Sequence, residues 1–478
     1  PNPTIQSNHP IYHLTFGRRV KDMRNAIRKG VEKMNFGMDK FMPDTLVLAA
    51  ALTIVTFFVG IFAADQTPWQ MVLHWGEGFW GLLSFSMQMF LAIAAGYVAA
   101  SSPPGRALLR RVARAPKTPL GAILFSCYFL AIVSWFNWAM GTIIAAFLAR
   151  EIAANHEKLD FKLLIAVGYC VSLCIGILGP STPEFLLSAD PTSYMAEYLS
   201  EPVPLFDTMF DPGLVASEIL VFFIAIPFLC WLIHPPKDQV PTVDQAIRAR
   251  FRAQDEAVDE LRKNRKPKKE MTFAERCDSS PILIWILCVP MILYIVYWFV
   301  TRGFDLDLNI VNFIVLMLGF LLHGTPASLN LAFQEGARSA YGVALQFPLY
   351  AGIQGMISGS GLITIIANAF ASISTTATFA HWTFLVGVIL NIFVPSSGGL
   401  FAVAGPSLVT AGSLIDVPAN QTIIAFTTGE VISNMIQPFW AIPLLGIAGL
   451  KMKDIVGYCI LFFIVSVVLC NLCFIIFW

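Results

Sequence analysis

The chain has 478 residues, of which 56% are hydrophobic and 13% are charged, and its 31 basic residues balance its 31 acidic residues. Soluble proteins carry about 25% charged residues, so this composition excludes a soluble enzyme, a nucleic-acid-binding protein with a basic face and a secreted disulfide scaffold. The apolar residues lie in long blocks, and a helix of about 20 such residues spans a bilayer. The sequence therefore predicts an all-α membrane protein that contacts membrane lipid and no nucleic acid.

Residues 1–43 are polar and basic and lack the apolar stretch of a signal peptide, so they are predicted to form a cytoplasmic N-terminal segment. Apolar blocks of sufficient length then predict about nine crossings, at 44–64, 79–100, 162–180, 214–234, 281–301, 307–323, 341–366, 420–446 and 454–477. The polar stretch 235–280 is predicted to be a cytoplasmic linker.

Two further apolar stretches, 119–150 and 379–412, do not fit as crossings. Each is too long for one crossing and too short for two, which need about 40 residues. Basic residues flank the first stretch on both sides, and Pro395-Ser396-Ser397-Gly398-Gly399 breaks the second. Both are predicted to be re-entrant hairpins, each entering and leaving the membrane on one side.

The distribution of basic residues predicts the orientation of the chain, because cytoplasmic loops are enriched in Lys and Arg. With the N-terminus in the cytoplasm and the C-terminus outside, 30 of the 31 basic residues lie in cytoplasmic segments, and Arg302 is the exception. The loop 181–213 contains no Lys or Arg and carries six acids, among them Glu184, so it is predicted to be external.

The two halves of the chain contain the same order of elements: crossing, crossing, hairpin, crossing, crossing. The first repeat covers 44–234 and the second 307–478, and the extra crossing in 281–306 inverts the second repeat. Inverted repeats with interrupted helices near the bilayer midplane are typical of secondary transporters. Irregular backbone at that depth is tolerated only where it lines a protected cavity, so the interruptions predict the position of the site.

Four interruptions converge in this arrangement: the two hairpin tips and breaks in the helices that follow them, near residues 179–183 and 427–434. Their hydroxyl, amide and backbone groups are predicted to bind substrate through Ser134, Asn137, Trp138, Ser181, Thr182, Asn391, Ser396, Ser397, Gly398, Ser433 and Asn434. Glu430, Thr427 and Thr428 are predicted to bind the coupling ion, either a proton or a sodium ion at the hairpin tips. No other cofactor is expected.

Apart from Lys162 at the cytoplasmic end of the crossing 162–180, the predicted crossings contain no Lys or Arg, and this indicates which ligand the site binds. Helix dipoles and hydrogen bonds must hold a bound carboxylate, or a cation must accompany it. Both conditions favour a small monocarboxylate carried by cation or proton symport. Glu430 either binds the coupling ion or caps its broken helix, Glu218 is predicted to be interfacial, and Trp135 and Trp138 either line an acyl-chain site or pack the hairpin.

Alternatives within transport are a carrier of a C4-dicarboxylate, an amino acid or a peptide. A channel needs a continuous hydrated path, and the inverted repeat with its paired hairpins disfavours this class. An enzyme is not expected, because the sequence contains no His-Glu-x-x-His, Gly-x-Ser-x-Gly or Walker motif.

Three segments resemble the signatures of the short-chain fatty acid transporter family (AtoE type), within the broader ion-transporter superfamily. They are SWFNWAMGTIIAAFLAREIA (134–153), NIFVPSSGGLFAVAGPSLVTAG (391–412) and NMIQPFWAIPLLGIAGLK (434–451). The resemblance implies a homodimer in the bacterial inner membrane, with a scaffold domain and a moving domain that holds both hairpins. It also implies an elevator-like motion and import of short-chain fatty acids such as butyrate or acetoacetate.

Overall fold

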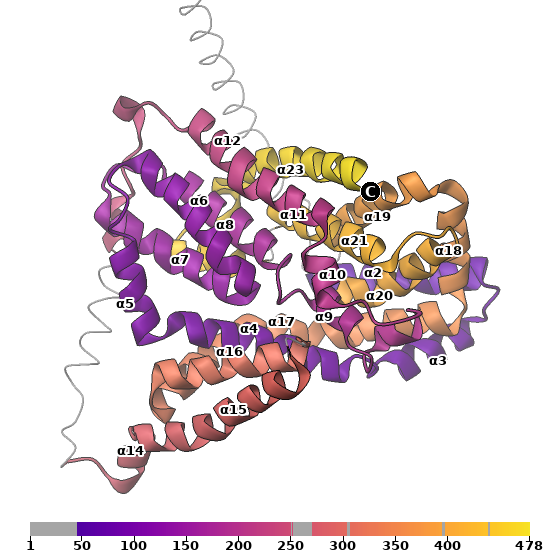
Figure 1. Ribbon diagram of the computed structural model, residues 1–478, viewed down its shortest axis with the longest axis horizontal. Coiled ribbons are helices and arrows are strands. Elements are labelled where there is room, and N and C mark those ends of the chain that lie inside the picture. The colour runs from indigo at the N-terminus through magenta and orange to yellow at the C-terminus, as the bar shows by residue number, and fades with distance from the viewer. Residues whose placement is uncertain (1–44, 250, 252–269, 304–305, 394–396, 438–439) are drawn as a thin grey trace, which may run out of the picture.

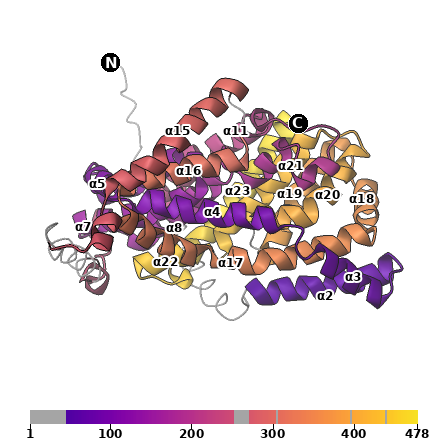
Figure 2. The ribbon, with the colours of Figure 1, turned by 90° about the horizontal axis from the view of Figure 1, so that it is seen from below.

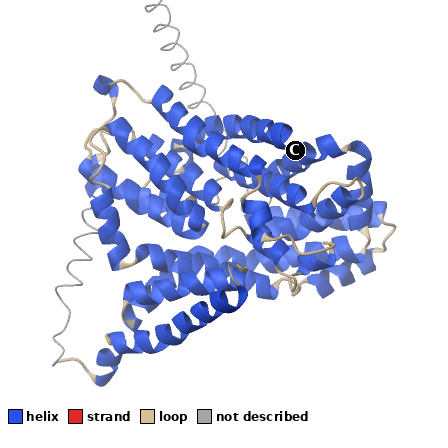
Figure 3. Cartoon of the chain, in the orientation of Figure 1, coloured by secondary structure: helices blue, strands red, loops and turns tan. Residues whose placement is uncertain are grey.

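The computed structural model describes residues 45–249, 251, 270–303, 306–393, 397–437 and 440–478. Within these residues the regular elements are helices, and the only strand-like pairing is a single bridge between Lys158 and Thr242 (Figure 3). A helix satisfies its backbone hydrogen bonds internally, as an apolar chain in lipid requires. The predicted all-α membrane fold is confirmed.

The first half of the chain forms a long series of helices with short connections. They are α2 (Thr45–Ala63), α3 (Pro68–Gly78), α4 (Leu83–Ser101), α5 (Pro103–Val112), α6 (Pro119–Phe136), α7 (Trp138–Asn155), α8 (Phe161–Gly176), α9 (Pro183–Ala189), α10 (Leu205–Met209), α11 (Pro212–Glu218) and α12 (Ile226–Ile233). A π-helical segment, Ile219–Ala225, joins α11 to α12.

The second half continues in the same way after the linker. Its helices are α14 (Phe273–Asp278), α15 (Pro281–Arg302), α16 (Leu308–His323), α17 (Pro326–Gly359), α18 (Leu362–Ile373), α19 (Thr376–Phe393), α20 (Ser397–Ser413), α21 (Ala419–Ser433), α22 (Ile442–Ala448) and α23 (Val456–Phe477).

The helices of the two halves pack in matching ways. α6 and α7 form an antiparallel pair against α8, and α19 and α20 form a pair against α21. α7 also packs against α4, and α20 packs against α17. α4 and α17 pack side by side along one edge of both groups, with α6–α8 toward one end of the molecule and α18–α21 toward the other (Figures 1 and 2).

The stretches predicted to be hairpins, 119–150 and 379–412, correspond to the pairs α6–α7 and α19–α20. Asn137 alone separates α6 from α7, whereas the turn between α19 and α20 lies outside the described residues. α6 by itself has the length and apolar composition of a membrane span. Re-entry of the hairpins therefore stays a prediction.

Five helices of the described chain are long and apolar enough to cross a membrane: α4, α6, the continuous Pro212–Ile233, α15 and α23. α17 and α18 together add a sixth if their 77° bend lies within one span. α15 is the most peripheral of them, with 17% of its apolar window buried, so most of its surface is available to lipid or to a partner subunit. The number of crossings and the homodimer stay predictions.

Two helix boundaries differ from those expected. α17 begins at Pro326 rather than near 341, because Thr325 caps it by accepting a hydrogen bond from Ser328 N. It ends at Gly359, next to Gly361, whose φ of +79° favours glycine. The interruption predicted near 427–434 falls at the end of that range, because α21 stays helical through Thr427–Glu430 and ends at Ser433. Gly429 instead allows close contact with the backbone of Phe384 on α19.

Candidate functional site

The first hairpin turns at Asn137, which caps α7. Its Oδ1 accepts a hydrogen bond from Met140 N at 2.9 Å, and its backbone N–H donates to Ser134 O at 3.0 Å. Asparagine is a favoured N-cap because its side chain satisfies a backbone N–H of the first helical turn. The hydroxyl of Ser134 is fully buried and has no hydrogen-bond partner among the described residues.

The break between α8 and α9 packs against this turn. The backbone N–H of Trp138 donates to Ser181 Oγ at 3.3 Å, and the hydroxyl of Thr182 donates to Ile177 O at 2.9 Å. Gly179 contacts the carbonyl of Trp135 so closely that no Cβ would fit. The structure thus brings together the first tip and the first break, and their polar groups mostly satisfy one another.

The second hairpin reaches the end of α21 through Asn391. Its Nδ2 lies 2.8 Å from each of Glu430 O, Ser433 Oγ and Asn434 Oδ1. The amide of Gln437 donates to Asn391 O. Because Asn434 Oδ1 faces Asn391, its Nδ2 remains a buried donor for which the described residues supply no partner.

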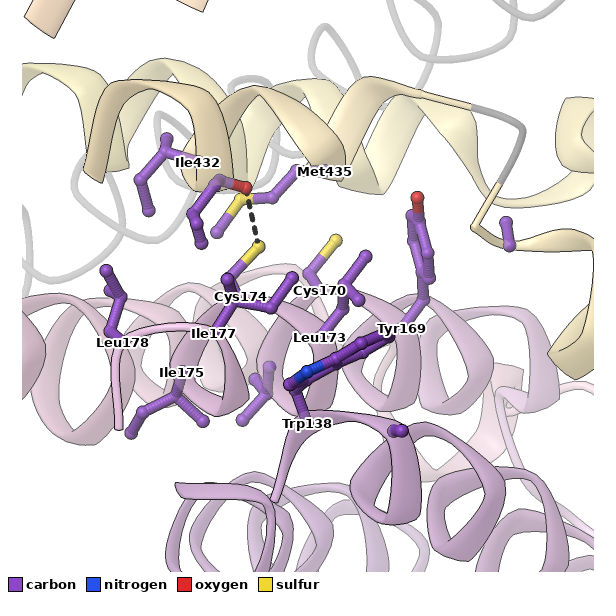
Figure 4. Packing of buried hydrophobic residues seen from close by; sticks show 14 of the residues in the cluster. Trp138, Tyr169, Cys170, Leu173, Cys174, Ile175, Ile177, Leu178, Ile432 and Met435 are labelled. Carbon is purple, nitrogen blue, oxygen red and sulfur yellow. Dashed lines mark hydrogen bonds between the residues drawn. The ribbon is translucent and has the colours of Figure 1, made fainter. Parts of the chain in front are cut away.

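α8 holds the end of α21 in place. The hydroxyl of Tyr169 lies 2.6 Å from the carbonyl oxygens of Asn434 and Gln437, to which it can donate. Figure 4 shows the apolar packing beside it, where Cys174 Sγ donates to Val431 O at 3.2 Å. The two halves therefore meet at their interrupted helices, as the repeat predicts.

The N-terminus of α20 joins the second hairpin to the first half. The hydroxyl of Ser397 donates to Glu184 Oε1 at 2.6 Å. Gly398 lies against the ring of Phe85 on α4, which leaves no room for a Cβ. Ser396 was also predicted to bind substrate, but it lies outside the described residues.

The three predicted ion-binding residues are fully buried on α21. Both carboxylate oxygens of Glu430 lack a hydrogen bond within the described part of the chain, and so do the hydroxyls of Thr427 and Thr428. Thr427 precedes Glu430 by three residues, so the two share a helix face. Buried polar groups are nearly always paired, and this unpaired set indicates a place for a ligand.

Two acids lie where sequence reasoning did not place them. Glu184 was expected in an external loop, but α9 carries it fully buried beside Ser397. Glu218 was expected at an interface and is 7% exposed. A signal for Glu184 was present, because Pro183 can start a helix and Phe185-Leu186-Leu187 then makes that helix apolar.

Glu184 and Glu430 belong to one cluster. Glu430 interacts electrostatically with Glu184 and with Ser397. The hydroxyl of Tyr194 interacts electrostatically with both acids. Ser397 makes its hydrogen bond to Glu184, while the carboxylate of Glu430 faces the same hydroxyl without hydrogen-bond geometry. We call Glu184, Tyr194, Ser397 and Glu430 the acidic cluster. No group of three or more His, Cys, Asp or Glu suited to a metal ion occurs in the described chain.

A cavity of about 330 Å³ lies next to the first tip, between α4, α7, α8 and α17. The rings of Trp138 and Trp440 on its wall are 5.6 Å apart and perpendicular within a few degrees. Ile93, Ile143 and Leu173 add apolar surface. The ion pair of Glu335 and Arg338, 2.8 Å apart and largely exposed, also lines the cavity.

Buried polar helix ends inside an all-helical membrane fold are typical of secondary transporters. The chain shares its fold with the YdaH transporter of Alcanivorax borkumensis, whose crystal structure matches with a TM-score of 0.55 at 12% identity, over 90% of this chain and 96% of that one.

The protein belongs to the short-chain fatty acid transporter family, whose sequence profile, described as "Short chain fatty acid transporter", matches residues 26–477. A predicted short-chain fatty acid transporter of Escherichia coli (strain K12) is 35% identical over 88% of this chain and 93% of its own. Another, from Haemophilus influenzae, is 34% identical over the same shares. The family resemblance seen in the sequence is confirmed.

Proposed function

We propose that the protein imports short-chain fatty acids, such as butyrate or acetoacetate, by cation or proton symport. The observation that carries this proposal is the charge of the site. Two glutamates are buried, Glu184 in the first turn of α9 and Glu430 near the end of α21. The groups that interact electrostatically with Glu430 include no Lys, Arg or His of the described chain. An anionic substrate that enters such a site needs a cation with it, because opposite charge must compensate buried carboxylates.

The headgroup of the substrate would meet donors rather than cations. Asn434 Nδ2 and Ser134 Oγ are buried and lack partners in the described structure, and an amide or hydroxyl can donate to one carboxylate. Other predicted site residues act around them: Asn391, which also contacts Ser433, orients Asn434, and Ser181 and Thr182 hold the first tip. One carboxylate is easier to satisfy here than two, which disfavours a dicarboxylate.

The acyl chain would lie in the 330 Å³ cavity against Trp138. Ligand sites in proteins are mostly apolar with a few polar groups that orient the ligand. The cavity has this character, with tryptophan and aliphatic side chains inside and charges at Glu335 and Arg338. Its shared wall with the first tip supports the acyl-chain role of Trp138 over a packing role alone.

The transport cycle would move both hairpins together with α8 and α21 in an elevator-type motion against α4 and α17. Tyr169 and Asn391 link the two hairpin groups through the end of α21, which supports their movement as one body. We further propose a homodimer in the bacterial inner membrane, with the N-terminus in the cytoplasm and the C-terminus outside.

Uptake by proteoliposomes tests this function. Labelled butyrate, acetoacetate and succinate are offered under separate Na⁺ and pH gradients. We expect saturable accumulation of the two monocarboxylates driven by one of the gradients. Uptake of succinate alone would refute the monocarboxylate assignment, and flux that never saturates and ignores both gradients would indicate a channel.

Asn434→Ala tests the headgroup site in the same assay. We expect at least a tenfold loss of butyrate uptake, equivalent to about 1.4 kcal/mol, because a buried donor is removed. Asn155→Ala is the control, since Asn155 is exposed at the end of α7 and its side chain donates within its own helix to Glu151 O. Equal uptake by both variants would exclude Asn434 from the site.

A further inference from the structure

The acidic cluster brings together groups from parts of the chain that are far apart in sequence. Glu184 lies on α9 in the first half, whereas Ser397 begins α20 and Glu430 lies on α21 in the second. Ser397 Oγ is 2.6 Å from Glu184 Oε1. The cluster therefore forms only when the second hairpin is seated against α9.

The cluster contains more acceptors than donors. Of the four carboxylate oxygens, Glu184 Oε1 accepts a hydrogen bond from Ser397, and the other three have no partner in the described chain. Both glutamates are 0% exposed. The hydroxyl of Tyr194, which interacts with both acids, is itself buried without a partner among the described residues. These unpaired oxygens could therefore accept a hydrogen bond from one ligand or coordinate one cation.

Two ionised carboxylates cannot remain buried together without a compensating charge. The titratable groups found to interact with this pair are each other and Tyr194, none of which is cationic. α20 contributes Ser397, and the one titratable side chain of α19, His381, places its Nδ1 3.2 Å from Asn471 Oδ1 on α23. The compensating charge must therefore come from solution. One bound monovalent cation or proton lowers the net charge of the pair from that of two carboxylate ions to that of one.

We propose that Glu184 and Glu430 together bind one monovalent cation, a proton or Na⁺, with Ser397 and Tyr194 completing its oxygen shell. This inference rests on the proposed function, in which a cation accompanies the substrate, and it assigns that cation to a site shared by both repeats. A bound cation stabilises the contact of α20 with α9. Without it, repulsion between the carboxylates opposes the seating of the second hairpin.

Cation binding is tested on purified protein without any organic substrate. Thermal unfolding is followed in NaCl against choline chloride at constant ionic strength, and separately across a range of pH. We expect the wild-type midpoint to rise by roughly 5 °C with saturating Na⁺ or with falling pH, and the responding arm identifies the cation. Glu184→Gln and Glu430→Gln should each abolish that response.

Glu218→Gln is the matched control. Glu218 is also a buried glutamate with an unpartnered oxygen in the described structure, but it lies on α11, outside the acidic cluster. It should retain the wild-type response. A wild-type midpoint insensitive to both cations, or a response that survives in either Gln variant, would overturn the shared site. If one glutamine variant does not fold, Ser397→Ala replaces it and should weaken the response severalfold.

Transport separates this inference from the proposed function. Glu430→Gln should lose gradient-driven accumulation of butyrate by at least tenfold while it keeps exchange of internal for external butyrate. If the wild type binds the cation but does not transport butyrate, the substrate assignment fails and the site stands. If the wild type accumulates butyrate and both Gln variants still couple it to the gradient, the site fails and the function stands.

Discussion

The two hairpin tips have the same place in their repeats but differ in how their polar groups are satisfied. At the first tip, Asn137 bonds to its own helix and Ser181 accepts from Trp138 N. Around the second tip, Asn391 Nδ2 lies 2.8 Å from Glu430 O and Ser433 Oγ on α21 and from Asn434 Oδ1 just after it. Neither carboxylate oxygen of Glu430 is paired within the described residues. The comparison teaches that an architectural repeat does not make a chemical repeat. Hydrogen bonds hold the turn of the first tip, whereas the second tip lies beside the carboxyl group of Glu430, which has no partner among the described residues.

The largest effect is expected from the close glycine–backbone contact that each half contains. Gly179→Ala and Gly429→Ala would each drive a Cβ into a backbone carbonyl, of Trp135 and of Phe384 respectively. A backbone cannot move aside as a side chain can, so we expect a loss of about 3 kcal/mol or more and little folded protein by size-exclusion chromatography. Gly76→Ala, which meets nothing within 4 Å, should purify as wild type does. Normal yields from both glycine variants would show that the breaks are not closely packed.

The next effect is expected from the two asparagines near the hairpin tips, whose hydrogen bonds differ between the halves. Asn391→Ala leaves several buried groups without their partner, so we expect butyrate uptake to fall by more than tenfold. Asn137→Ala removes a helix cap, which costs about 1 kcal/mol, and should lower the unfolding midpoint by roughly 3 °C with much smaller loss of uptake. Uptake is measured per folded protein. The reverse order of the two variants would place the substrate headgroup at the first tip.

The smallest effect is expected where the halves meet at the surface. Lys162 Nζ lies 2.8 Å from Asp454 Oδ1, and Lys451 N donates to Oδ2. Partial burial raises the pKa of Asp454, but the hydrogen bonds from Lys162 and Lys451 outweigh it and lower the pKa below its ordinary value of 3.8. Because the folded-state pKa is lowered, the ionised carboxylate contributes its full stabilisation above the ordinary pKa of 3.8. This contribution is lost as the pH falls through the folded-state pKa.

Asp454→Asn should therefore lower the unfolding midpoint by roughly 1 to 2 °C at neutral pH. The difference from wild type should vanish as the pH is lowered through the folded-state pKa of Asp454, in scans of thermal unfolding against pH. A difference that persists unchanged in acid would assign the effect to packing rather than to charge.

Much of the fold follows from the sequence, because long apolar blocks must form helices in lipid. The first break was predicted near residues 179–183 from Gly179 and Pro180, and the structure ends α8 at Gly176 and starts α9 at Pro183. The second break was predicted over 427–434, and α21 ends at Ser433 within that range. Gly429 does not break the helix, because it serves a close contact with Phe384 on α19.

The site was predictable where a polar side chain lies at or near the end of a long apolar helix, as those of Asn137 and Asn391 do. Glu184 was missed because its segment carries several acids and no basic residue, and loop charge is a sign of orientation. Its burial depends on contacts with α20 and α21, more than 200 residues away in sequence. Such contacts leave no periodic pattern in the chain.

The linker offers a means to follow the first hairpin group from outside the membrane. Leu159 N donates to Pro241 O at 2.9 Å and Val243 N to Glu157 O at 3.0 Å, so 240–243 is fastened to the turn between α7 and α8. Arg150 of α7 also donates to Phe251 O at 3.2 Å. In the elevator motion proposed above, this segment would travel with α7 and α8. A spin label at exposed Thr242, paired with one at Phe273 before α15, would then report that displacement as a change in distance.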